Sequence, residues 1–103
     1  MLLQMIVRMW RGWVATERAA EYVTYINETG MAEYRQTPGN RDAQMWTRDL
    51  GDGRTEVVTV SWWDDLDVIK GFAGEDISRA VLYDEDAQYL IGHEDTVVHY
   101  EVD

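Results

Sequence analysis

Apolar and β-favouring residues open the chain, and they predict a strand over residues 2–10. The run LLQMIVRMW has no helical period that lasts along its length, so we expect it to be buried on at least one face of a sheet. After Trp13 the pattern changes to positions three and four residues apart, namely Ala19, Tyr22, Val23, Ile26 and Gly30. This stripe predicts an amphipathic helix of about four to five turns, with Thr16 as its N-cap.

The next two stretches predict a β-hairpin. The segment TPGN at 37–40 is typical of a turn, because proline fixes φ and glycine or asparagine tolerates positive φ. A strand is expected at about residues 43–48. The short Gly-rich link LGDGR then leads into TEVVTVSWW, which is the most strand-like run of the sequence. We therefore expect these two strands to be antiparallel neighbours.

The rest of the chain predicts helices and a last strand. Asp64 is placed to cap a helix that ends at Gly74. The apolar side of this helix would be formed by Leu66, Ile69 and Phe72. A less regular helical region is expected over residues 76–91, in two pieces, with Gly92 as its end. The run DTVVHYEV at 95–102 predicts the closing strand.

The predicted order is β-α-β-β-α-(α)-β, a ferredoxin-like arrangement in a single domain of residues 1–103. Its class is α+β, with helices on one face of a four-stranded antiparallel sheet. The other face needs a cover, because most side chains that the third strand would place there are apolar. We expect a second copy of the chain as this cover, since most soluble oligomers are symmetric homo-oligomers. The residues predicted at the homodimer interface are Trp62, Val58, Val60 and His99.

Charge and composition narrow the choice of partners and compartment. Nine Lys and Arg residues stand against 20 Asp and Glu residues, which gives a net charge of −11. A field of this sign repels phosphate backbones and anionic lipids, so no nucleic-acid or membrane partner is expected. The absence of cysteine excludes disulfides and thiolate sites. The first apolar run is too short for a signal peptide and no run has the length of a membrane span, so a cytoplasmic protein is expected.

The run VVTVSWWDDLDVIKGFAGEDISRAVLY resembles the antibiotic biosynthesis monooxygenase (ABM) domains of the dimeric α+β barrel superfamily. A preceding strand IVRMWRG, the turn PGN and the closing VVHYEV extend the resemblance over nearly the whole chain. It implies a dimer in which two sheets pair face to face. It also implies a pocket between sheet and helices for a small aromatic or polyketide-type compound.

Haem-degrading members of this family use an Asn on the first strand, a Trp at the end of the third and a His on a later helix. The positions that correspond here are Val7, Trp63 and Leu82. Because no His is in reach of that site to ligate iron, no haem is expected. The two His residues and nearby carboxylates follow no metal-ligand pattern, so no metal is expected either.

Cofactor-free oxygenases of aromatic polyketides, also in the family, use an Asn and a Tyr at positions that correspond to Thr59 and Ile69. An Arg of theirs lies one helical turn from the position of Arg79. The resemblance therefore implies a monooxygenase-like protein that needs no cofactor. Two alternatives stay open: a non-catalytic small-molecule-binding or structural homodimer, and an isomerase or cyclase that uses His93 or Tyr22 as acid or base.

Alternation along the third strand places its odd positions under the helices if the even ones face a partner. Small hydroxyl side chains beside a large indole would leave room there for a ligand. The candidate catalytic residues are Trp63, Thr59 and Arg79, of which Arg79 would stabilise an enolate. The candidate substrate-binding residues are Tyr22, Ser61, Phe72, Tyr83 and Val7.

Each of the main candidates also has a purely structural interpretation. Trp63 is equally well explained as an indole that closes one end of the core. Tyr22 lies on the apolar stripe of its helix, where packing alone accounts for it. Arg79 could instead be an exposed residue that forms an ion pair with Glu75 or Asp76.

Overall fold

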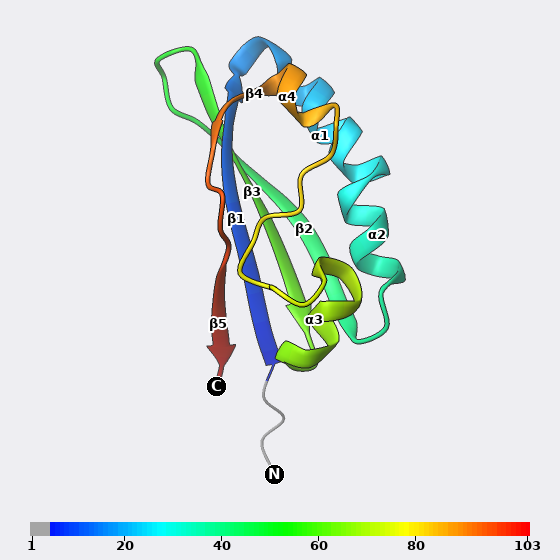
Figure 1. Cartoon of the computed structure of the whole chain (residues 1–103). Coiled ribbons are helices and arrows are strands. Elements are labelled where there is room, and N and C mark those ends of the chain that lie inside the picture. Colours follow the sequence, from blue (N-terminus) through cyan, green and yellow to red (C-terminus); the bar gives the residue numbers. More distant parts are fainter. Residues whose placement is uncertain (1–4) are drawn as a thin grey trace.

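The computed structural model of the chain describes residues 5–103. They form one antiparallel sheet whose helices all lie on one side of it (Figure 1). The strand order is β2-β3-β1-β4, and β5 pairs with β1 as well. The predicted α+β, ferredoxin-like architecture is therefore confirmed. Residues 2–4 of the predicted first strand lie outside the described residues.

The elements follow one another in nearly the predicted order. The strands are β1 (Met5–Ala15), β2 (Asn40–Asp49), β3 (Arg54–Trp63), β4 (Leu90–His93) and β5 (Val98–Val102). The helices are a 3-10 turn (Thr16–Arg18), α1 (Ala19–Glu28), α2 (Gly30–Gln36), α3 (Leu66–Ala73) and α4 (Asp86–Tyr89). Both β4 and β5 run antiparallel to β1, so the fourth position of the sheet is shared by two short strands.

The prediction of a helical region over residues 76–91 is wrong for most of that range. Only α4 is helical there, and Gly92 belongs to β4 instead of ending a helix. The backbone of this segment bonds to a distant part of the chain, because Val97 N donates to Ser78 O over 2.8 Å and Ala80 N to Asp95 O over 2.9 Å. Tertiary pairing thus overrides a weak helical period.

The long first helix begins and ends differently from the prediction. Thr16 does not cap it, since its hydroxyl lies 2.9 Å from the hydroxyl of Thr55 on β3. The helix is interrupted at Thr29, whose hydroxyl donates to the carbonyl of Tyr25 over 2.9 Å. It then continues as α2 well beyond the predicted stripe.

The helix after β3 begins one residue later than predicted. Asp65, not Asp64, is its N-cap, because the carboxylate of Asp65 accepts a hydrogen bond from Val68 N at 3.0 Å. Asp64 instead forms an ion pair with Arg41 on β2. Gly74 ends the helix as predicted, with a φ of 83° that favours glycine.

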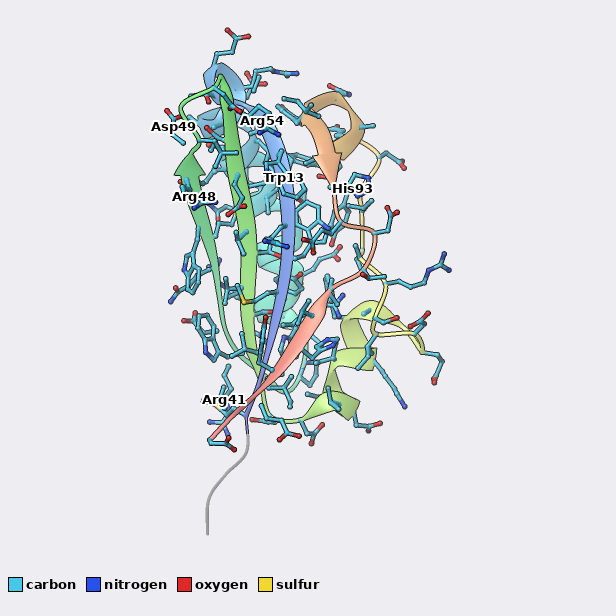
Figure 2. All side chains as sticks on the ribbon, turned by 90° about the vertical axis from the view of Figure 1, so that its left-hand side faces the viewer. Trp13, Arg41, Arg48, Asp49, Arg54 and His93 are labelled. Atoms are coloured by element: carbon cyan, nitrogen blue, oxygen red, sulfur yellow. The ribbon has the colours of Figure 1, made fainter. Side chains whose placement is uncertain are left out.

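The two faces of the sheet differ sharply. The register pairs Ile6 with Trp63 and Trp10 with Thr59, and these side chains point toward the helices. The opposite face, here called the outer face, has no helix in front of it (Figure 2). Its apolar residues are Met5, Val7, Met9, Trp13, Trp46, Val58, Val60, Trp62, Val98, Tyr100 and Val102.

Two residues lie on the face opposite to the predicted one. Val7 pairs with Trp62 and therefore lies on the outer face, away from any pocket under the helices. His99 pairs with Arg8 and lies on the helix side, not at the outer face. The first strand is apolar on both faces, so its sequence did not show which side chains point inward; the register with β3 and β5 does.

Candidate functional site

A recess lies between the sheet, the helices α1 and α2, and the irregular segment that follows α3. Its sheet side is formed by Arg8, Trp10 and Thr59, and its helix side by Tyr22, Ile26 and Tyr34. Phe72, Leu82 and Tyr83 form the wall toward solvent. The free space is about 380 Å³ with the open mouth included, but the centre of a water molecule can occupy only about 30 Å³. As it stands the recess therefore has room for about two water molecules.

The wall toward solvent also borders a second depression and is joined to α2 by Tyr83. Leu82, Tyr83 and Asp86 also line a wider depression beside β4, so they separate that depression from the recess. The Tyr83 hydroxyl donates to the carboxylate of Glu33 on α2, and burial together with this carboxylate raises the pKa of Tyr83. A ligand larger than about two water molecules would therefore require an outward movement of this wall.

Arg8 is the most unusual residue of the recess, because it is 1% exposed and yet cationic. Its guanidinium donates to the backbone carbonyl of Ile77 and, over 3.1 Å, to that of Arg79. A ring nitrogen of His99 lies 3.1 Å from Nη1, and the Phe72 ring centroid lies 5.9 Å from the guanidinium carbon. The Nε atom has no hydrogen-bond partner. Burial lowers the pKa of Arg8.

His99 is the neutral partner of this cation. Burial, and after it the charge of Arg8, lowers the pKa of His99 below its usual value. The neutral imidazole can then accept the hydrogen bond from Nη1 of Arg8. The uncharged His99 ring thus accepts a hydrogen bond from the buried Arg8 cation without adding a second positive charge.

A second polar group of the recess is the Tyr22–Asp86 pair. The Tyr22 hydroxyl donates to the carboxylate of Asp86 over 3.0 Å, and the other carboxylate oxygen accepts from Tyr83 N over 2.6 Å. Burial, followed by the charge of Asp86, raises the pKa of Tyr22. Tyr22 therefore stays neutral, and because its proton is directed to Asp86, it offers an acceptor oxygen to the recess.

The structure brings together only part of the predicted site. Thr59, Tyr22, Phe72 and Tyr83 all line the recess. Arg79 does not line it, since its side chain is exposed and only its carbonyl contacts Arg8.

Trp63 and Ser61 lie behind the recess, in the core. Trp63 is fully buried, its indole nitrogen donates to the Ser61 hydroxyl over 2.8 Å, and the Tyr34 ring packs edge-on against it at 5.9 Å. The Phe72 ring, 6.3 Å from the indole, lies on the recess side. This geometry supports the core interpretation of Trp63.

Several residues of the recess were not singled out by the sequence, among them Arg8, Trp10, Tyr34 and Asp86. Arg8 and Trp10 alternate with apolar neighbours in a strand that is apolar on both faces, so no local signal marks them as inward. Asp86 lies in the acidic run Asp84-Glu85-Asp86, where nothing distinguishes the buried member from the exposed ones. The one available signal was the position of Arg8, a charged residue in an otherwise apolar stretch, because charged residues are rarely buried without a reason.

The described residues contain neither a metal-binding cluster nor a membrane-spanning helix. Within residues 5–103, no three or more His, Asp or Glu side chains gather closely enough to hold a metal ion. No helix in the described part of the chain is long and apolar enough to cross a membrane.

Comparison with solved structures finds close likenesses in fold. A Bacillus cereus protein assigned to the antibiotic biosynthesis monooxygenases is 16% identical, with a TM-score of 0.62 over 95% of this chain and 92% of that one. The ActVA-Orf6 monooxygenase of Streptomyces coelicolor, in complex with nanaomycin D, is 13% identical, with a TM-score of 0.55 over 97% and 86%. The haem degrader MhuD of Mycobacterium tuberculosis, with two haems bound, is 16% identical, with a TM-score of 0.53 over 94% of each chain.

The likeness is found in structure and not in sequence comparisons. No protein-family model matches the chain, and no curated protein matches it either. At identities of 13–16%, the structural likeness establishes the fold and not the activity. The chain therefore shares the fold of the antibiotic biosynthesis monooxygenase-like proteins, as its resemblance to that family implied.

Proposed function

We propose that this chain binds a small aromatic or polyketide-type compound in the recess and oxygenates it without metal or haem. The observation that carries the proposal is the recess itself, in which aromatic walls surround a few buried polar groups. The likeness in fold to a monooxygenase in complex with nanaomycin D supports this choice of ligand.

The chemistry needs a substrate with an acidic C–H bond, such as an anthrone. Loss of that proton gives a carbanion, which transfers one electron to O₂, and the two radicals combine to form a C–O bond. The resulting hydroperoxide loses water as its O–O bond breaks, so that CH₂ and O₂ become C=O and H₂O. The protein binds and orients the substrate, shields it from water and stabilises its negative charge.

Oxygen uptake with 1,8-dihydroxyanthrone and with a naphthoquinol tests this function. We expect uptake that depends on the protein, and a product that carries one oxygen atom from ¹⁸O₂. Gly30→Leu should reduce the rate at least about tenfold, since Gly30 lines the recess and a leucine there would fill it.

Gly30→Ala is the matched control for this variant. A Cβ atom at Gly30 would meet Tyr83 at 3.5 Å and Ile26 at 3.9 Å, which is ordinary contact, so alanine should leave the rate nearly unchanged. Protein-dependent binding without oxygen uptake would contradict the oxygenase and favour the non-catalytic alternative. Uptake that survives Gly30→Leu in the folded protein would show that the recess is not the site.

We also propose that two copies of the chain pair through their outer faces. The centre of this face is apolar, with Val58 and Val60 only 7% and 1% exposed. On its edge strand β5, the side chains of Val98 and Tyr100 are 44% and 53% exposed. Arg41 at one end and Arg48 and Arg54 at the other lie near its margin (Figure 2). An apolar centre with a charged margin is the usual composition of a protein interface.

Light scattering at micromolar concentration should give about twice the chain mass of 12.0 kDa. Val98→Glu should shift the dissociation constant by about 100-fold or more, because symmetric pairing would bring two added charges into an apolar contact. Leu66→Glu is the control, since Leu66 is 46% exposed but lies at the start of α3, away from the outer face. A clean monomer in the unsubstituted protein would exclude this dimer.

A further inference from the structure

We propose that the ligand of the recess presents an anionic oxygen to Arg8, so that the bound form is an aromatic carboxylate, phenolate or enolate and not a neutral aromatic compound. The inference rests on the proposed function in one respect, that the recess is the binding site. It does not require that the ligand is turned over.

The first support is that Arg8 is a buried cation without a counter-ion. Its side chain is 1% exposed, and a guanidinium keeps its proton at any physiological pH. Among residues 5–103, no carboxylate forms an ion pair with it, although the chain has 20 Asp and Glu residues. A buried charge is strongly unfavourable unless an opposite charge or a full set of hydrogen bonds accompanies it.

The second support is that the hydrogen bonds of Arg8 are incomplete. Its hydrogen-bond partners are two backbone carbonyls and the neutral ring of His99, none of which carries a negative charge. Burial lowers the pKa of Arg8, and the nearby Tyr34 hydroxyl raises it and so partly offsets the effect of burial, but this hydroxyl is not a carboxylate. The Nε atom is buried and has no partner at all. An anionic oxygen in the recess, which Arg8 lines, would supply the missing negative charge.

Asp86 is the group of the recess that opposes an anion. Both of its carboxylate oxygens already accept hydrogen bonds, from the Tyr22 hydroxyl and from Tyr83 N, which spreads its negative charge over two donors. It forms no ion pair with Arg8 within 4.0 Å. The positive and negative groups thus occupy separate parts of the recess lining.

A simpler explanation is that Arg8 only ties β1 to residues 77–79 and that water satisfies Nε. The recess has room for water, so this alternative is physically sound. It differs from the proposal in one measurable respect. A structural Arg8 gives the recess no preference between a charged ligand and a neutral ligand of the same shape.

Isothermal titration with 2-naphthoate and 2-naphthamide separates the two explanations, because these probes share their rings and differ in charge. The unsubstituted protein should bind naphthoate about 10- to 100-fold more tightly, as expected for a charge-assisted hydrogen bond shielded from water. Arg8→Met should abolish this preference, whereas Arg8→Lys, which keeps the charge, should retain a smaller preference of the same sign.

Arg79→Met is the matched control, since its side chain is exposed and the carbonyl that Arg8 uses is retained. Equal affinity for the two probes in the unsubstituted protein, or no binding of either, would overturn the proposal even if Arg8→Met does not fold. A preference that survives in folded Arg8→Met would overturn it too. Oxygen uptake is measured separately, so an anion preference without turnover would contradict the oxygenase alone.

Discussion

Replacing Trp63 by alanine is expected to lower the free energy of unfolding by about 3–5 kcal/mol, the range for removing a large aromatic side chain from a core. Trp63 is 0% exposed and packs against Tyr34 and Phe72, so its loss leaves a cavity beside these two rings. The Ser61 hydroxyl also loses its partner. A loss of this size is a large part of the stability of an ordinary domain, about 5–15 kcal/mol.

Denaturant unfolding at one fixed protein concentration measures this loss, because pairing of two copies would add a concentration-dependent term. Leu66→Ala is the control, since Leu66 is 46% exposed at the start of α3, outside the outer face, and its truncation should cost about 1 kcal/mol or less. A loss below about 1.5 kcal/mol in Trp63→Ala would contradict the core role.

Trp63→Phe distinguishes packing from chemistry at this position. The phenyl ring keeps most of the apolar contact but removes the donor to Ser61, so a moderate loss of stability is expected. Oxygen uptake per folded molecule should be nearly unchanged, because Phe72 and Tyr34 lie between the indole and the recess. A folded Trp63→Phe protein without turnover would show that the indole acts in the reaction.

Replacing Asp86 by asparagine is expected to cost on the order of 3 kcal/mol. The carboxylate accepts hydrogen bonds from Tyr22 and from Tyr83 N, and an amide can accept at only one of its two ends. The other end would place an N–H group against Tyr22, whose hydroxyl would then have to accept a hydrogen bond instead of donating one. The charge-assisted bond is lost in either case, and because Asp86 is 3% exposed, water cannot replace it.

A double-mutant cycle of Asp86→Asn with Tyr22→Phe checks the origin of the loss. The two effects should couple by about 1 kcal/mol, since both remove the same hydrogen bond. The control is Asp84→Asn, an exposed neighbour for which a change of about 0.5 kcal/mol or less is expected. Additive effects of Tyr22 and Asp86 would mean that the pair does not stabilise the fold.

Much of the fold could be predicted because its signals are local. The alternation TEVVTVSWW assigned opposite faces to Trp62 and Trp63, and the register with β1 agrees. Gly74 ended a helix because its positive φ suits glycine wherever it occurs. The region after α3 could not be predicted, since its backbone bonds to residues 95–97 and not to itself.

The candidate site was less predictable than the fold. The predicted residues that line the recess are Thr59, Tyr22, Phe72 and Tyr83. The first three are on a strand and helices that the sequence predicted, whereas Tyr83 is on the irregular segment after α3. Arg79 was expected on a helix and is found on an irregular segment, exposed to solvent.

Patterns between close neighbours were thus enough for the element order, the hairpin, the apolar outer face and the acidic surface. The environment of Arg8 required the three-dimensional structure, because its partners Ile77 and His99 lie 69 and 91 residues away in the chain. A strand that is apolar on both faces does not reveal which of its side chains is buried. Hydrophobicity acts on each residue separately, whereas an unpaired buried charge exists only once distant segments have packed around it.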